Sequence, residues 1–272
     1  ISIHAFLDVH WVKNEMGEPI EFKNHPFHVD IYKDFSPKLC VLKAAQIGMT
    51  TCELIKLLWA TKNGNLDAIY ILPTDSDINV MVGSKLNRII AQNPVFQEWT
   101  KDKDTIEQKQ IGDRYIHFRG SWTQKAAIMV TSDWNLVDEI DASKQDVIEQ
   151  YSTRLQHSKY KWEHVFSHPS APGFGIDRYW QKSDQKHWLI KCGGCTKEQY
   201  LDWPDSIDPK RECYQCKFCF KELTNDERRK GRWARKKGME KAEYSGYWIS
   251  LLMCPWVTAK EIIGYHKDKT EE

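Results

Sequence analysis

The chain has 272 residues, 41% of them hydrophobic and 28% charged, which allows a sizeable core and excludes a disordered chain. Its formal net charge is +1, so any contact with nucleic acid has to come from a local basic patch. No apolar run approaches the ~20 residues that a membrane-spanning helix needs, and no signal-peptide pattern opens the chain. We therefore expect a soluble, intracellular protein with no membrane partner.

The first half of the sequence alternates between short apolar segments and segments with helical spacing. Strands are expected at 39–42, 68–72, 134–137 and 164–166, with a hairpin at 108–118. Helices are expected at 51–59, 80–91 and 147–155, and Pro94 should close the second of them. Short buried strands that alternate with helices predict an α/β fold with a mostly parallel sheet flanked by helices.

The residues between the first predicted strand and helix lie where a phosphate-binding loop belongs. In such a loop, backbone N–H groups hold phosphate oxygens at the amino end of a helix, and a Ser or Thr reaches Mg²⁺. Against the pattern G-x-x-x-x-G-K-[ST], Gly48 and Thr50 fit, but Lys43 replaces the first glycine and Met49 the lysine. The alternative is a glycine turn that caps a core helix. The candidate nucleotide-binding residues are Lys43, Ala44, Ala45, Gln46, Ile47, Gly48, Met49, Thr50 and Thr51.

Two adjacent acidic residues end the apolar run at 134–137. An aspartate at the carboxyl end of a strand can hold Mg²⁺, and a following glutamate can activate a water molecule, so Asp138 and Glu139 are candidate catalytic residues. The alternative is a pair of acids that cap a helix before Ser143. The loop and the acids occur in the order expected of a P-loop NTPase-like domain, which favours nucleotide hydrolysis.

Four of the eight cysteines form two C-x-x-C pairs that are 20 residues apart, namely Cys192, Cys195, Cys216 and Cys219. This is the spacing of a closed, structural Cys₄ zinc site. Cys213 could pair with Cys216 instead, but Cys219 would then have no role. Iron–sulfur ligation and redox activity are the other readings. The remaining three cysteines lie in apolar surroundings, where we expect buried thiols.

The composition changes after Pro172, where Gly, Lys, Cys and Trp become more frequent. We place a boundary near 169–175, with a nucleotide-hydrolysing core at 1–175. The second part, 176–272, should contain a small zinc ribbon, a basic helix and the segments that complete the core. Residues 225–241 hold eight Arg or Lys against three Asp or Glu, which fits either a phosphate-binding surface or a solvated helix face.

These motifs, taken in order, resemble the terminase large subunits of lambda-like tailed phages. Residues 43–51 are similar to that family's phosphate loop, in which the lysine stands at the loop's start. Leu72-Pro73-Thr74 resembles the next motif, and Ser167-His168-Pro169-Ser170 resembles the coupling motif. The cysteine pairs, with Tyr214 two residues before Cys216, follow the family's order as well. The resemblance covers about 26–265.

The resemblance implies an ATPase motor that drives double-stranded DNA into a procapsid, with ATP, Mg²⁺ and Zn²⁺ as cofactors. Lys43 would bind phosphates, Thr50 and Asp138 would position Mg²⁺, Glu139 would activate water, and Ser167 would sense the γ-phosphate. Residues near Pro26-Phe27 would contact adenine.

The implied partners of such a motor are the portal protein, the terminase small subunit and further copies of the chain in a ring, in the host cytoplasm on a procapsid. The family's nuclease would begin after about 272, so DNA cleavage is not expected of these residues. Two other functions stay open, a helicase-like nucleic-acid-dependent ATPase and a zinc-ribbon DNA-binding module beside an inactive loop.

Overall fold

A computed structural model describes residues 1–122 and 130–268 of the chain. Its largest sheet has eight strands in the order β13-β1-β7-β6-β2-β5-β4-β3. The strands are β1 (Lys38–Lys43), β2 (Ala68–Leu72), β3 (Thr100–Asp104), β4 (Gln108–Ile111), β5 (Arg114–Gly120), β6 (Trp134–Asp138), β7 (Trp162–Ser167) and β13 (Ser245–Ile249). Pairing is parallel from β13 to β5, and only β4 and β3 run antiparallel to their neighbours. The predicted mostly parallel α/β sheet is thus confirmed.

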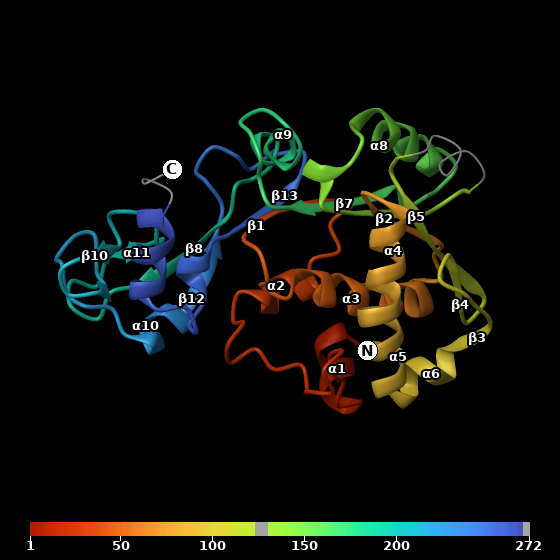
Figure 1. The fold of residues 1–272 in the computed structure, drawn as a ribbon, viewed down its shortest axis with the longest axis horizontal. Helices are drawn as coiled ribbons and strands as arrows, with labels where there is room; N and C mark the ends of the chain where they lie inside the picture. The colour runs from red at the N-terminus through yellow and green to blue at the C-terminus, as the bar shows by residue number, and fades with distance from the viewer. Residues whose placement is uncertain (123–129, 269–272) are drawn as a thin grey trace.

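Helices cover both faces of this sheet (Figure 1). The helices are α1 (Ile3–Val9), α2 (His28–Lys33), α3 (Met49–Gly64), α4 (Asp75–Met81), α5 (Asn87–Gln92), α6 (Pro94–Trp99), α8 (Gln145–Ser152) and α9 (Ile176–Gln181). Short turns of 3₁₀ helix lie at Ile140–Ala142, Thr153–Leu155 and Leu251–Met253, and a π-helical turn lies at Val82–Leu86. In the described part of the chain, no helix is long and apolar enough to cross a membrane.

The alternation of side chains along the strands explains why both faces are covered. In β1, Leu39 and Val41 join the core formed with α3, whereas Cys40 between them joins the core formed with α8 and α9. Successive side chains of a strand point to opposite faces, so a strand that is apolar at every position needs a helical layer on each side. The buried strand pattern therefore fixes a three-layer arrangement.

A smaller lobe at the left of Figure 1 contains the cysteine-rich segment. It consists of β8 (His187–Lys191), β9 (Glu198–Gln199), β10 (Ile207–Asp208), β11 (Cys213–Tyr214), α10 (Asn225–Arg229), β12 (Gly231–Ala234) and α11 (Ala259–Asp268). After β12 the chain returns to the large sheet, where β13 pairs with β1. The segment between β12 and α11 therefore borders β1, the strand that leads into the candidate phosphate loop.

Two local predictions differ from the structure. Pro94 was predicted to end a helix, and α5 does end just before it, at Gln92. Pro94 is also the first residue of a new helix, α6, where its fixed φ and missing N–H are tolerated. The expected basic helix is only the five residues Asn225–Arg229, since the chain then enters β12 and pairs with β8. The pattern of charge did not reveal this strand.

Candidate functional site

The candidate phosphate loop joins the carboxyl end of β1 to the amino end of α3. Gln46 and Gly48 have φ values of 57° and 78°, in the left-handed region, and these values fold the loop tightly over the helix. Glycine adopts this conformation without steric cost. The amide of Ala44 donates to the carbonyl of Ile249 in β13, so this residue extends the sheet. The amides that can face a ligand are those from Ala45 onward.

The side chains of the loop point in several directions. Ile47 and Met49 are 1% and 2% exposed and pack in the hydrophobic core. Thr50 and Thr51 diverge, because the hydroxyl of Thr50 donates to Asp138 whereas that of Thr51 lies 3.0 Å from a carboxylate oxygen of Glu15. Of the two threonines, only Thr50 is directed toward the predicted catalytic acids.

Lys43 is paired with Glu139, 96 positions later in the chain. Its Nζ lies 2.6 Å from Oε1 of Glu139, and its side chain is 7% exposed against 43% for the glutamate. Glu139 has a φ of 56°, and its amide donates to the carbonyl of Phe166 in the neighbouring strand β7. A non-glycine residue in this conformation is strained, and such strain is often found at functional sites. The predicted lysine and the predicted base therefore meet at one edge of the sheet.

Asp138 is buried at the carboxyl end of β6. Its Oδ2 accepts hydrogen bonds from Thr50 Oγ1 at 2.9 Å and from the hydroxyl of Tyr70 at 2.8 Å. Its Oδ1 is buried and has no hydrogen-bond partner among the described residues. Burial raises the pKa of Asp138, and the nearby ammonium of Lys43 opposes this effect. A buried carboxylate oxygen without a partner, beside a threonine hydroxyl, fits the oxygen ligands that Mg²⁺ prefers.

Ser167 ends β7, the strand beside β6. Its hydroxyl lies 3.3 Å from Oε2 of Glu139 and also donates to the carbonyl of His168. The amide of Asp141 donates to the same hydroxyl at 3.3 Å. The carboxylate of Asp141 then accepts from Ser170 and from the amide of Ile176, so it holds the segment that follows Ser167. The predicted coupling residue thus contacts the predicted base directly.

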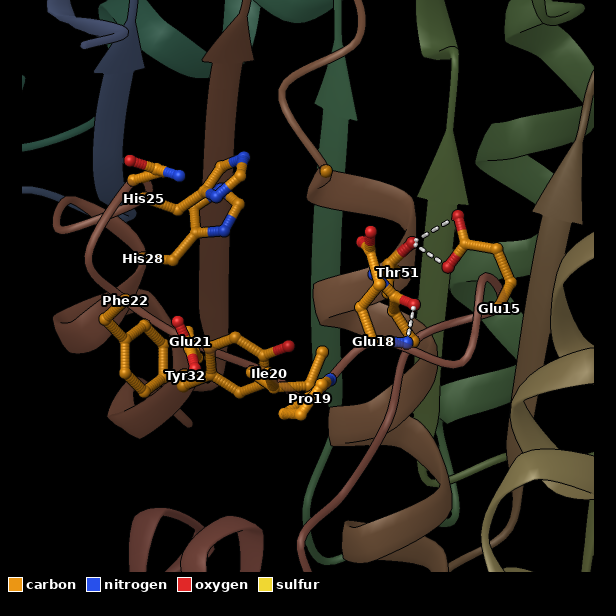
Figure 2. Close-up of a pocket in the computed structure, with 13 residues that line it drawn as sticks. Glu15, Glu18, Pro19, Ile20, Glu21, Phe22, His25, His28, Tyr32 and Thr51 are labelled. Atoms are coloured by element: carbon orange, nitrogen blue, oxygen red, sulfur yellow. Dashed lines mark hydrogen bonds between the residues drawn. The ribbon is translucent and has the colours of Figure 1, made fainter. Parts of the chain in front are cut away.

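A cavity of about 470 Å³ lies beside the loop, between the amino-terminal segment and the start of α3. Figure 2 shows His25 and His28 together on one side, and Glu15 bonded to Thr51 on the other. Burial lowers the pKa of His28 to about 3, so its ring is neutral. The cavity is lined by Asn14, Glu15, Glu18, Pro19, Ile20, Glu21, Phe22, Asn24, His25, His28, Tyr32, Gly48 and Thr51.

The four predicted cysteine ligands form a compact cluster in the smaller lobe. Their sulfur atoms all lie within 4.8 Å of one another. Cys192 and Cys219 are 3.7 Å apart, and Cys195 and Cys216 are 3.6 Å apart. Thiolates at ~2.3 Å from a tetrahedral ion would be about 3.8 Å apart, so the residues fit zinc. Cys213 lies outside the cluster, in β11.

At least three of the eight basic residues in 225–241 are bonded to other groups of the protein. Arg228 is 2% exposed and donates to backbone carbonyls. Arg232 pairs with Glu198, and Lys236 bonds to Gln185. These contacts therefore involve a minority of the positive charges in this segment.

A parallel sheet whose first strand runs through a tight loop into a helix, with acids at the end of a neighbouring strand, defines the P-loop NTPase class of fold. The sequence profile described as "Phage terminase large subunit gpA, ATPase domain" matches residues 17–238. The chain belongs to this family and is an ATPase. No curated protein matches the chain by sequence.

Solved structures of phage terminases share this fold. The large terminase of bacteriophage HK97 superposes with a TM-score of 0.54 at 15% identity, over 66% of this chain and 40% of that one. The ATPase domain of the large terminase of Thermus phage P74-26 gives a TM-score of 0.54 at 9% identity, over 94% of this chain and 89% of that one. The chain therefore spans less than half the length of the HK97 protein.

The structure brings together Lys43, Thr50, Asp138, Glu139 and Ser167 from three adjacent strands and one helix. Phe27, which was predicted to lie near the adenine of the nucleotide, is buried in the core. Its neighbours His25 and His28 line the cavity. Tyr70 and Glu15 are not among the residues predicted from the sequence. Tyr70 sits in an apolar strand and Glu15 in a polar turn, so neither had a sequence signal.

Proposed function

We propose that this chain is the ATP-hydrolysing motor domain of a DNA-packaging terminase and couples hydrolysis to the movement of double-stranded DNA into a procapsid. The observation that carries this proposal is the contact of Lys43 with Glu139, 2.6 Å from Nζ to Oε1, next to Asp138 and Thr50. An inactive loop would not need a buried lysine, a strained glutamate and an unpartnered carboxylate oxygen at one sheet edge.

In this mechanism the phosphates lie over the amides of 45–50, and the nucleoside occupies the neighbouring cavity at Gly48 and Thr51. Lys43 leaves Glu139 for the β- and γ-phosphates when the nucleotide binds. A lysine can do this from the start of the loop because its ammonium is a point charge on a flexible stem. The exchange of partners frees the carboxylate of Glu139 just when a phosphate is present.

Thr50 and Asp138 would hold Mg²⁺, which would offset the negative charge of the phosphates when bound. The hydroxyl of Tyr70 fixes the Asp138 carboxylate so that Oδ1 stays free. Glu139 orients and deprotonates the attacking water. Ser167 contacts Glu139 and the segment after β7, so it is placed to relay a change at the γ-phosphate.

The smaller lobe is proposed to carry a structural zinc ion on Cys192, Cys195, Cys216 and Cys219, because a closed set of four thiolates leaves no open position for catalysis. The proposed partners are double-stranded DNA, the portal protein, the small subunit and further copies of the chain in a ring. The proposed location is the host cytoplasm, with the motor docked on the procapsid during packaging.

The test is a steady-state ATPase assay of the wild type and the Glu139→Gln variant, with and without double-stranded DNA. Gln keeps the size of the side chain but removes the base, so nucleotide binding should persist while turnover falls by about 100-fold or more. Absence of hydrolysis in the wild type would favour the zinc-ribbon module with an inactive loop. DNA-strand displacement without a portal would favour the helicase-like ATPase.

A further inference from the structure

We propose that Arg228 is a positioning residue through which the cysteine-rich lobe holds one wall of the nucleotide cavity. Binding of metal at the cysteine cluster then tightens binding of nucleotide at the phosphate loop, and binding of nucleotide tightens binding of metal. This inference rests on the proposed zinc and nucleotide sites.

The contacts that join the cysteine cluster to the cavity begin at the first C-x-x-C turn, 192–195, which we call the knuckle. The amide of Gly193, between Cys192 and Cys195, donates to Oε1 of Glu227 at 2.6 Å. Glu227 is also the acidic member of the capping box that starts α10 together with Thr224. The knuckle and the start of α10 therefore share one carboxylate, so the position of this short helix depends on the geometry of the knuckle.

Arg228 follows Glu227 and is almost completely buried. Its Nη2 donates to the carbonyls of Leu252 at 2.9 Å, Cys254 at 2.6 Å and Val257 at 3.3 Å. The ring of Tyr214, two residues before Cys216, lies 3.6 Å from the guanidinium carbon, and its hydroxyl donates to Val257 as well. One charged group thus holds the backbone of 252–257, which follows β13.

That backbone segment carries Trp256 against His25, one of the residues that line the nucleotide cavity. The indole lies 4.5 Å from the ring of His25, which stacks on His28 at 5.4 Å. A Cβ added to Gly48 would meet His28 at 3.5 Å and His25 at 3.9 Å. The two histidines are therefore the side chains that lie directly over the loop glycine.

A second contact joins the same lobe to the same turn. The indole nitrogen of Trp233 in β12 donates to the carbonyl of Phe27 at 2.9 Å, between the two histidines. Trp233 also packs edge-on against Trp188 in β8. The turn at 25–28 is thus held from the lobe on two sides. If the lobe loosens, this wall of the cavity loses its support, and the nucleotide must order it on binding.

The test measures binding of ATPγS by calorimetry to the wild type, Arg228→Lys, Trp256→Ala and the double variant, together with their zinc content. Lysine keeps the positive charge but has no fixed planar group with which to donate hydrogen bonds to all three carbonyls. We expect Arg228→Lys to keep its zinc and bind nucleotide at least fivefold more weakly. The same substitution at Arg232, an exposed residue of the same lobe paired with Glu198, is the matched control and should bind as the wild type does.

The double variant separates positioning from general destabilisation. If Arg228 acts through Trp256, the effect of Arg228→Lys disappears when Trp256 is already alanine. Full additivity, or wild-type binding by Arg228→Lys, would overturn the inference while leaving the nucleotide site intact. A wild type that binds no nucleotide would overturn the proposed function as well.

A measurement on the wild type alone covers the case in which Arg228→Lys does not fold. Because coupling is reciprocal, ATPγS must tighten zinc binding, measured by equilibrium competition with a chelator, by the same factor by which zinc tightens nucleotide binding. An equal zinc affinity with and without ATPγS contradicts the inference.

Discussion

Lys43 offers the sharpest test of the site, because a lysine at this end of the loop departs most from an ordinary phosphate loop. Its side chain is 7% exposed and its ammonium contacts Glu139, so it does not project into solvent from a strand end. A hydrogen bond between an ammonium and a phosphate contributes about 1.5–3 kcal/mol. Lys43→Ala should therefore weaken ATP binding about 10- to 150-fold and reduce turnover by about 100- to 1,000-fold.

The assay is steady-state hydrolysis together with calorimetric binding of ATPγS. Lys38→Ala is the matched control, because Lys38 starts the same strand and forms an exposed pair with Glu243. Lys38→Ala should change neither the rate of hydrolysis nor the affinity for ATPγS, since an exposed ion pair contributes at most about 1 kcal/mol to stability. Lys43→Ala should unfold at nearly the wild-type temperature because its partner Glu139 is 43% exposed. Binding and turnover within twofold of wild type in Lys43→Ala would refute the assigned role.

Returning the lysine to its usual position should not restore activity. Met49 holds that position, but its side chain is 2% exposed and packs in the core. An ammonium there has no buried partner, so Met49→Lys should lower the free energy of unfolding by about 3–5 kcal/mol. Rescue of Lys43→Ala by Met49→Lys at unchanged stability would show that residue 49 can turn toward the phosphates.

Three further variants and one control variant test the metal sites. Cys195→Ser should lose the zinc and expose the lobe to proteolysis; absence of zinc from the purified wild type would remove that site. Tyr70→Phe removes one of the two hydroxyls on Asp138, so the Mg²⁺ concentration for half-maximal ATPγS binding should rise about three- to tenfold. Tyr151→Phe, which removes a buried hydroxyl bonded to the carbonyl of Gly120, should leave it unchanged. Asp138→Asn should bind ATPγS with little response to Mg²⁺, and a full response would mean that another group holds the metal.

The sequence could predict the sheet and the place of the loop because those depend on local patterns. The apolar run at 68–72 and the glycine after β1 each carry their own signal, and both are found where expected. The cysteine cluster was also predictable, since two C-x-x-C pairs at this spacing are typical of a Cys₄ metal site.

The contacts that complete the site could not be predicted in this way. Tyr70 reaches Asp138 across 68 positions of the chain, and its strand is apolar throughout, so nothing separates it from a core tyrosine. Arg228 was one of eight basic residues in a charged stretch, but the fold buries it against three carbonyls. Which polar residue becomes buried is decided by tertiary packing, and one sequence holds no local record of it.

The charges that meet at the sheet edge explain why a displaced lysine is sufficient. Lys43 brings one positive charge, whereas Asp138 and Glu139 bring two negative charges. Two unit charges 4 Å apart interact by about 4 kcal/mol at an effective dielectric constant of 20. ATP without a metal would therefore add negative charge to a site that already has a surplus of it. Bound Mg²⁺ would bring two positive charges and reduce this surplus, so the nucleotide would be favoured as its metal complex. In the proposed mechanism Lys43 would then have only to leave Glu139 for the phosphates, and residue 49 is left free to pack the core.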